Sequence, residues 1–274
     1  MNTSNALSPT ACLEYLDRIR YPARANSDVL EPSLQTLQAV HQAHLLAVPF
    51  ENLSIHYGQP IILQEELLFN KIVRLHRGGF CYELNGLFAW LLRQLGFQVT
   101  LLSAEVANEA GSYSPEFDHL TLLVHDLGGA DWLADVGFGD SFRLPVRFEA
   151  DVEHADADGH KYRLQMQDDV SGKNPKREYW ILQQFSDEKW QPQYRFTLQP
   201  HQLTDFTERC HYQQTSPESH FTQNRICSLA TPTGRITLSD LRLITTIHEK
   251  REERLLHSEE EYQKVLEEMF GVVL

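Results

Sequence analysis

Residues 77–88 read Arg77-Gly78-Gly79-Phe80-Cys81-Tyr82-Glu83-Leu84-Asn85-Gly86-Leu87-Phe88. The two glycines give the backbone conformational freedom directly before Cys81. Cys81 opens a predicted helix, so it lies beside free backbone N–H groups and the positive end of the helix dipole. That setting lowers the pKa of a thiol from about 8.5 toward neutrality, which predicts a nucleophilic thiolate; an inert buried cysteine is the alternative. The predicted apolar face, at helical spacing, consists of Leu84, Leu87, Phe88, Leu91, Leu92 and Leu95, with Gly96 at the C-cap.

Composition and charge exclude several classes of protein. The chain has 274 residues, of which 42% are hydrophobic and 23% charged, so it can form one large domain or two to three small ones. Its net charge of −14 disfavours a nucleic-acid partner and means that local donors must hold any polyanionic substrate. The apolar runs are too short to span a bilayer, and the stretch Met1–Asn5 has no signal-peptide features. We therefore expect no membrane partner and a cytoplasmic location.

The cysteines and histidines do not indicate a metal site. Cys12, Cys81, Cys210 and Cys227 form no C-x-x-C pair, which argues against zinc and against a disulfide framework. The remaining candidates, such as His41 and His44, lack a second ligand pair at metal spacing and are interpreted as packing residues of a helix.

The periodicity of the chain changes twice. Residues 1–96 are predicted to be helical, with 50–55 as an extended linker. From Phe97 a run of antiparallel strands without intervening helices indicates a barrel or a sandwich. The last third mixes strands with a helix that Ser258 and Glu261 cap, and the charged run 249–254 is interpreted as solvated surface. The fold class is therefore α+β, and residues 149–177 receive no role.

A base and an orienting acid for Cys81 are available on one predicted hairpin. A nucleophilic cysteine needs a base, and the base needs a third group to fix its tautomer. His119 starts one strand and Asp135 ends the next. If the hairpin is roughly symmetric, Asp135 falls across from residues 119–122, and cross-strand neighbours lie about 5 Å apart at Cβ. The sequence thus makes a Cys81–His119–Asp135 relay available.

At this point the chain resembles a known family, the arylamine N-acetyltransferases. The stretch from Arg77 to Asn85 is similar to the family's active-site signature. The similarity extends in order over nearly the whole chain, and no position of the relay departs from the pattern. Its other segments are Ala43 to Leu53, Asp118-His119, Asp135 to Gly139, Ser216 to Phe221, and Cys227 to Leu238.

The resemblance implies a fold of three parts and the residues that act in it. The parts are an N-terminal helical bundle (1–96), a central antiparallel β-barrel (97–198) and a C-terminal α/β lid (199–274), around a cysteine-protease-like Cys-His-Asp core. Cys81 would carry the acyl group, His119 would be its base and Asp135 would orient the base. Candidate substrate-binding residues are Phe50, Phe80, Phe138 and Phe221, and candidate coenzyme contacts are Ser216 and Gly137.

The implied reaction is a double displacement. Cys81 takes an acetyl group from acetyl-coenzyme A and passes it to an arylamine or arylhydrazine. A cysteine hydrolase, such as an amidase, protease or transglutaminase-like enzyme, could use the same relay, and a non-catalytic binding module could share the scaffold. The sequence leaves open the preferred amine, the acyl chain, the residues that hold the coenzyme phosphates and the oligomeric state.

Overall fold

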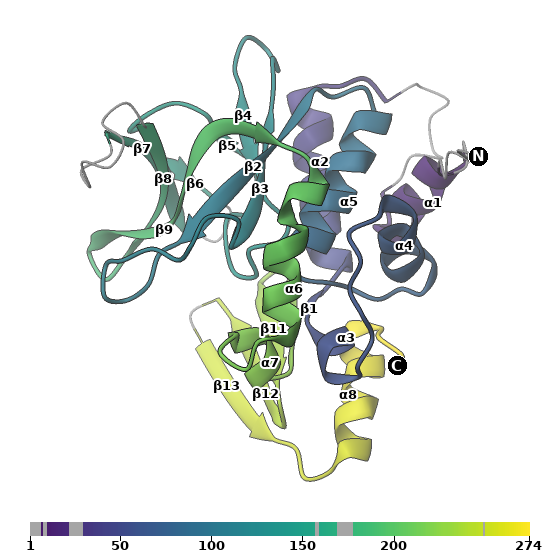
Figure 1. Ribbon diagram of the computed structural model, residues 1–274. Coiled ribbons are helices and arrows are strands. Elements are labelled where there is room, and N and C mark those ends of the chain that lie inside the picture. The colour runs from purple at the N-terminus through teal and green to yellow at the C-terminus, as the bar shows by residue number, and fades with distance from the viewer. Residues whose placement is uncertain (1–6, 8–9, 22–29, 157–158, 169–177, 249) are drawn as a thin grey trace.

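The computed structural model describes residues 7, 10–21, 30–156, 159–168, 178–248 and 250–274. Figure 1 shows a helical region at the upper right, a large curved sheet at the upper left, and a smaller sheet with a helix below them. The chain therefore mixes helices and antiparallel sheets, as the α+β prediction states. Among the described residues, no helix combines the length and the apolar character needed to cross a membrane.

Helix α5 (Cys81–Gln94) lies at the centre of the helical region. Every residue from Cys81 to Leu92 is buried, because neighbouring helices surround it and strand β3 covers another side. Trp90 of α5 stacks on Tyr15 and contacts the ring of Phe69 edge-on. The other helices of this region are α1 (Ala11–Arg18), α2 (Leu34–Ala47), α3 (Leu53–His56), α4 (Glu65–Phe69) and a π-helical turn, η1 (Asn70–Arg74).

The large sheet has eight strands paired antiparallel in the order β5-β4-β3-β2-β9-β8-β7-β6, and it curves into a near-closed barrel. Strand β3 (His119–Val124) is buried along its whole length, since one face meets the barrel interior and the other meets α5. The remaining strands are β2 (Val99–Val106), β4 (Trp132–Ala134), β5 (Val146–Arg147), β6 (His154–Ala155), β7 (Lys161–Asp168), β8 (Glu178–Ser186) and β9 (Lys189–His201).

The smaller sheet includes a strand from the N-terminal part of the chain. Its order is β1-β10-β11-β12-β13, and helix α8 (Glu259–Phe270) packs against it. Strand β1 (Phe50–Glu51) pairs with β10, placing Phe50 opposite Ser228. The other elements of this part are 3-10 helix η2 (Leu203–Phe206), α6 (Thr207–Thr215), α7 (His220–Gln223), β10 (Ile226–Thr231), β11 (Gly234–Ser239), β12 (Arg242–Ile247) and β13 (Lys250–Leu255).

The prediction of an extended linker at 50–55 is therefore wrong. Asn52 explains why the chain turns there, because its Oδ1 accepts the Ile226 N–H at 2.7 Å and its Nδ2 donates to Phe221 O at 2.9 Å. The carboxylate of Glu51 accepts the Leu53 N–H at 2.6 Å and so caps the short helix α3.

Two further segments add detail to the sequence interpretation. Strand β9 continues to His201, past the expected end of the barrel at 198. The run 250–254 is exposed as predicted, and it forms part of edge strand β13. Within 149–177, residues 157–158 and 169–177 lie outside the described part of the chain.

Candidate active site

Cys81 is the first residue of α5, and the backbone before it fits only glycine. A Cβ atom at Gly78 would lie 1.9 Å from Pro49 O, and one at Gly79 would lie 2.7 Å from the Glu83 side chain. Phe80 is extended, and its N–H donates to the Glu83 carboxylate at 3.2 Å. In the first turn, the Glu83 N–H donates to Phe80 O at 3.0 Å, while the N–H groups of Cys81 and Tyr82 have no acceptor within α5.

Buried ion pairs hold this turn in place. Lys71 Nζ lies 2.7 Å from Glu83 Oε1 and 3.7 Å from Glu51 Oε1, while Arg77 Nη2 lies 2.8 Å from Glu51 Oε1. Burial opposes ionisation of Glu51, yet the charges of Lys71 and Arg77 outweigh it and lower the pKa of that carboxyl. Breaking such a buried pair leaves an uncompensated charge, so this network fixes the start of α5 firmly.

His119 and Asp135 form a hydrogen bond at the end of the β3–β4 hairpin. Leu122 pairs with Ala134, so Asp135 continues opposite Thr121 and diagonally across from His119. His119 Nε2 lies 2.6 Å from Asp135 Oδ2, and both side chains are buried. The hydrogen bond that the hairpin symmetry made available is therefore present. Because Nε2 contacts Asp135, the Nδ1 nitrogen of His119 can contact a different partner.

Asp135 accepts three further hydrogen bonds from groups that the sequence interpretation missed. Tyr194 OH donates to Oδ2 at 2.9 Å, and Asn85 Nδ2 and Gly137 N donate to Oδ1 at 2.8 and 3.0 Å. Burial alone would raise the pKa of Asp135, but His119, the Asn85 amide and the Gly137 N–H lower it overall. Asp135 is thus held as a carboxylate. Asn85 lies one helical turn after Cys81, a spacing that could have indicated its place. No spacing in the sequence indicated that Tyr194 would contact Asp135.

The loop after Asp135 packs directly on Cys81. A Cβ atom at Gly137 would lie 2.8 Å from Cys81 Cα and 2.8 Å from Asn85 Nδ2, so only glycine fits. The backbone N–H of Leu120, the neighbour of His119, interacts with the Cys81 sulfur. The sulfur therefore lies against the start of β3.

The electrostatic setting of Cys81 corrects one sequence expectation. Burial raises the pKa of the thiol well above its usual value, and the carboxylates of Asp118 and Asp135 add to this rise, while the Leu120 N–H opposes it. Cys81 is only 4% exposed, so loss of hydration outweighs the helix start. A thiolate in this position needs a proton acceptor.

The four predicted aromatic residues fall into two groups. Phe80 and Phe50 both contact Phe221, with ring centroids 5.5 and 6.1 Å apart. Phe138 instead lies edge-on to the ring of His119, at 5.0 Å between centroids. Phe80 is fully buried beside Cys81, whereas the other three are partly exposed.

The two predicted coenzyme contacts have different settings. Gly137 lies against Cys81, but its N–H is occupied by Asp135. Ser216 follows α6 in a tight turn, where its hydroxyl accepts the Glu218 N–H at 3.2 Å. Among the described residues, no group of three or more His, Cys, Asp or Glu side chains could hold a metal ion.

His41 is a further residue of the site that the sequence interpretation assigned only to packing. Burial lowers its pKa to about 4, so its ring is neutral. Its Nδ1 lies 3.0 Å from Arg143 O, and its Nε2 lies 3.1 Å from Asp135 O and 3.2 Å from Asp135 N. With the proton on Nδ1, the ring donates to Arg143 O and its Nε2 accepts the Asp135 N–H. His41 thus anchors the backbone of Asp135.

Comparisons with known proteins identify the family of the chain. The family model described as N-acetyltransferase matches residues 33–274. Arylamine N-acetyltransferase 1 of Homo sapiens is 34% identical over 95% of this chain and 93% of its own length. A pineal gland arylamine N-acetyltransferase of Gallus gallus shows the same identity and coverage.

Solved structures give the same result at the level of the fold. The arylamine N-acetyltransferase of Salmonella typhimurium superimposes with a TM-score of 0.85 at 30% identity, covering 97% of this chain and 92% of that one. The enzyme of M. tuberculosis superimposes with a TM-score of 0.82 at 30% identity, covering 95% and 93%. With a family model that spans almost all of the sequence and relatives of this similarity, the chain belongs to the arylamine N-acetyltransferase family.

Proposed function

We propose that the protein transfers an acetyl group from acetyl-coenzyme A to an arylamine or arylhydrazine in two steps, through an acetyl group carried on Cys81. The observation that carries this proposal is the buried hydrogen bond of 2.6 Å between His119 and Asp135, on a hairpin whose following loop packs against Cys81. Family membership supports acetyl transfer to arylamines as the reaction.

In the first step the Cys81 sulfur attacks the carbonyl carbon of the thioester while His119 accepts the thiol proton. The raised pKa of Cys81 makes this transfer necessary, and Asp135 stabilises the resulting imidazolium. Backbone N–H groups at the start of α5 are the natural donors to the tetrahedral oxyanion. The bond between the carbonyl carbon and the coenzyme sulfur then breaks, and His119 returns the proton to that sulfur.

In the second step the amine nitrogen attacks the acetyl carbon on Cys81. His119 takes a proton from the nitrogen as the new C–N bond forms. The C–S bond to Cys81 breaks, and His119 returns the proton to the cysteine. The enzyme is thereby restored with the proton count balanced.

The aromatic side chains provide the acceptor site in this proposal. Phe80, Phe221 and Phe50 would form its apolar wall, and Phe138 would cover the ring of His119, since pockets for aromatic ligands are usually lined in this way. Gly137 would contribute by leaving room beside Cys81, and the Ser216 hydroxyl by donating to the coenzyme. In this scheme residues 1–96 supply the nucleophile, 97–198 the base and acid, and 199–274 the cover.

The decisive experiment mixes the protein with acetyl-coenzyme A in the absence of an amine. We expect one equivalent of free thiol per protein and a mass increase of one acetyl group on the peptide that contains Cys81. Adding an arylamine should discharge this adduct. Cys81→Ser is the control, because its nearly isosteric hydroxyl keeps the fold but should give neither the burst nor turnover.

Two results would contradict the proposal. Steady thiol release without an amine would indicate a hydrolase that uses the same residues. Unchanged activity in Cys81→Ala would remove Cys81 from the reaction altogether.

A further inference from the structure

The backbone two residues before His119 is strained. Phe117 has φ 67°, a left-handed conformation that crowds the Cβ atom of a bulky side chain. Residues in such conformations persist only where the surrounding contacts hold them, and they cluster at functional sites. Strand β3 begins two residues later, at His119. The contacts that hold Phe117 therefore also fix the start of this strand.

Hydrogen bonds from two elements hold the backbone around Phe117. The Phe117 N–H donates to Ser103 Oγ on β2 at 2.7 Å. The Tyr82 hydroxyl donates to Phe117 O at 2.8 Å and lies 3.2 Å from Asp118 O. Tyr82 is fully buried, and burial raises the pKa of its hydroxyl well above the usual value, so the hydroxyl remains a neutral donor.

Tyr82 links the backbone of the nucleophile to the backbone of the base through one side chain. It directly follows Cys81 at the start of α5, and the carbonyl groups that it contacts belong to the two residues that precede His119. The Leu120 N–H interacts with the Cys81 sulfur, so the start of β3 already lies against the sulfur. A small rotation of the backbone at 117–118 would therefore change the direction of the His119 ring relative to the sulfur.

Helix α6 holds the same segment through the side chain of Asp118. Its carboxylate lies 2.6 Å from Arg209 Nη2 and accepts a hydrogen bond from Gln213 Nε2 at 2.5 Å. The Asp118 side chain is only 14% exposed, so its charge depends on Arg209 for compensation. The segment 117–119 is thus held by α5, β2 and α6, and the Tyr82 hydroxyl is the contact that comes from the helix of the nucleophile.

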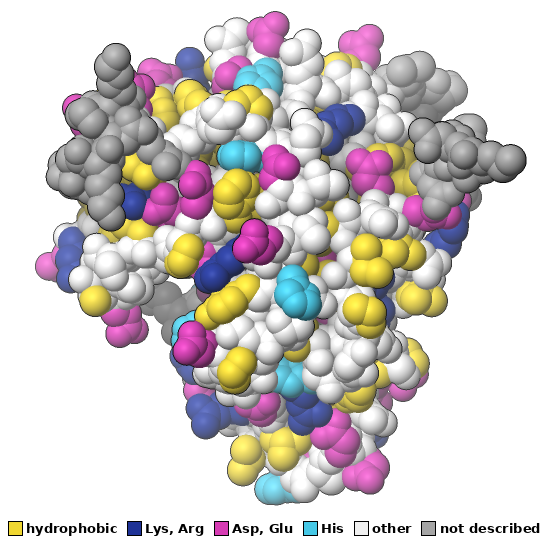
Figure 2. Space-filling model, in the orientation of Figure 1, with side chains coloured by type: hydrophobic (Ala, Val, Ile, Leu, Met, Phe, Trp, Pro, Cys, Tyr) yellow, Lys and Arg dark blue, Asp and Glu magenta, His cyan; other side chains and the backbone are white. Residues whose placement is uncertain are grey.

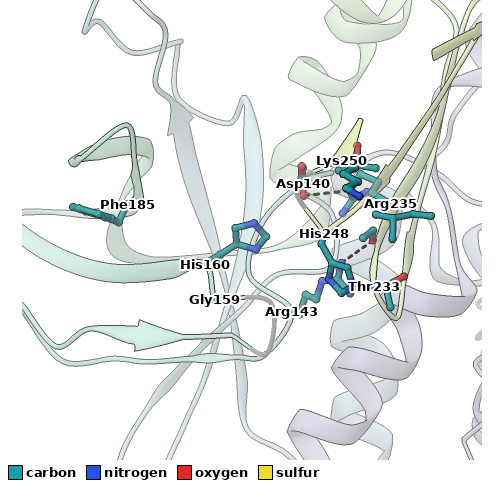
Figure 3. Close-up of a pocket in the computed structure, with 12 residues that line it drawn as sticks. Asp140, Arg143, Gly159, His160, Phe185, Thr233, Arg235, His248 and Lys250 are labelled. Atoms are coloured by element: carbon teal, nitrogen blue, oxygen red, sulfur yellow. Dashed lines mark hydrogen bonds and ion pairs between the residues drawn. The ribbon is translucent and has the colours of Figure 1, made fainter. Parts of the chain in front are cut away.

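A cavity of about 770 Å³ between the barrel and the C-terminal sheet does not include these contacts. Figure 2 shows the surface hollowed between these two regions at the left of the view, and Figure 3 shows the side chains that line the cavity. Asp140 and Arg143 are among them, whereas Tyr82, Ser103 and Phe117 are not. A change of the Tyr82 hydroxyl therefore leaves the lining of this cavity intact.

We propose that Tyr82 is a positioning residue of the reaction, whose hydroxyl holds the 117–118 backbone and thereby keeps the ring of His119 within reach of the Cys81 sulfur. The hydroxyl donates to backbone oxygens and takes no part in the proton transfers. Without it, the strain at Phe117 relaxes by rotation of the backbone that leads into His119. This inference rests on the proposed function and adds a residue to its site.

The test removes only the hydroxyl, in Tyr82→Phe. We expect kcat for arylamine acetylation to fall about ten-fold while KM for acetyl-coenzyme A stays within about two-fold, because the reacting groups are misplaced and ligand binding is not. The alkylation of Cys81 by iodoacetamide should shift toward alkaline pH, since His119 no longer takes the thiol proton efficiently. A merely structural role would lower the Tm and leave this pH profile unchanged.

Ser103→Ala is the second variant, because it removes the other hydrogen bond to Phe117. It should act in the same direction, and the loss of kcat in the double variant should be smaller than the product of the two single losses, since both side chains hold one segment. Tyr15→Phe is the matched control. It also loses a buried hydroxyl contact, 3.0 Å from His44 Nδ1, so it should lower the Tm and keep the native kcat and alkylation profile.

Two results would overturn the inference. One is a native kcat together with a native alkylation profile in Tyr82→Phe and Ser103→Ala. The other is a rise in KM alone, which would assign Tyr82 to ligand binding. Alkylation requires neither acetyl-coenzyme A nor an amine, so it tests the position of His119 separately from the reaction. A native protein that forms no acetyl adduct on Cys81 would contradict the proposed function and leave the alkylation comparison valid.

Discussion

In the proposed mechanism, the Cys81 thiol gives its proton to the ring of His119. Burial and two nearby carboxylates raise the pKa of the thiol, so the sulfur ionises near neutral pH only if its proton moves to a neighbouring base. His119, oriented by Asp135, is that base in the proposed mechanism.

His119→Gln should therefore shift the alkylation of Cys81 by iodoacetamide toward alkaline pH. Without the imidazole, the thiolate appears only as the pH approaches the raised pKa of the thiol, so we expect alkylation at pH 6 to be at least about ten-fold slower. The measurement is the alkylation rate from pH 5 to 10. His125→Gln is the matched control, because His125 lies at the other end of β3, next to Asp131. Identical profiles for His119→Gln and the native protein would exclude the pairing.

The elements that could be predicted from sequence are those whose determinants are local. The α5 and α8 helices carry their own apolar spacing and end signals: Glu261 N donates to Ser258 Oγ at 3.2 Å, and Gly271 takes the left-handed C-cap with φ 67°. The β3 strand also begins at His119, as predicted.

Elements that depend on distant partners could not be predicted in this way. Strand β1 is only two residues long and exists because β10 supplies its hydrogen bonds. Helix α6 has no clear apolar face, so periodicity gave no signal. In the site, Cys81, His119 and Asp135 lie next to turns that are visible in the sequence. Tyr194 and His41 contact Asp135 from other elements, and no local sequence pattern gives the position of those elements relative to Asp135.

The loop between β4 and β5 gives a prediction at the level of elements. Gly137→Ala would place a methyl group 2.8 Å from Cys81 Cα and 2.8 Å from Asn85 Nδ2, neither of which can move freely. We expect kcat/KM for arylamine acetylation to fall about a hundred-fold, since a displacement of about 1 Å in a reacting constellation has effects of this size. Thermal unfolding should change much less than activity. Gly128→Asn, in a hairpin loop with open space around it, should retain activity. Full activity of Gly137→Ala would show that the contact does not position Cys81.

His41 connects the three parts of the molecule. Its ring lies on α2, its Nε2 contacts the Asp135 backbone, and its Nδ1 contacts Arg143, whose side chain binds Thr231 and Gly234 of the C-terminal sheet. The ring accepts the Asp135 N–H only when it is neutral. Protonation is therefore coupled to the stability of the whole chain.

This coupling predicts a specific pH dependence of the free energy of unfolding. The pKa of His41 is lowered from 6.5 to about 4 in the folded state, so the unfolded state binds more protons between these values. Stability from this group is fully present above pH 6.5 and is lost as the pH falls toward 4, by roughly 3 kcal/mol. His41→Gln should show a decline in this window that is smaller by that amount, as measured by urea unfolding at several pH values. The control His56→Gln, at a partly exposed site, should keep the native slope. Parallel curves for His41→Gln and the native protein would refute the coupling.

The pairing of β1 with β10 has a consequence for how the protein is made. During translation Phe50 and Glu51 leave the ribosome long before Ser228 and Cys227, their strand partners, are synthesised. The nascent chain must keep this short segment unpaired until most of its length has emerged. Phe50 and Phe221 therefore come together late in synthesis. The aromatic wall proposed for the amine is completed only near the end of translation, and a chain that ends before Phe221 lacks it.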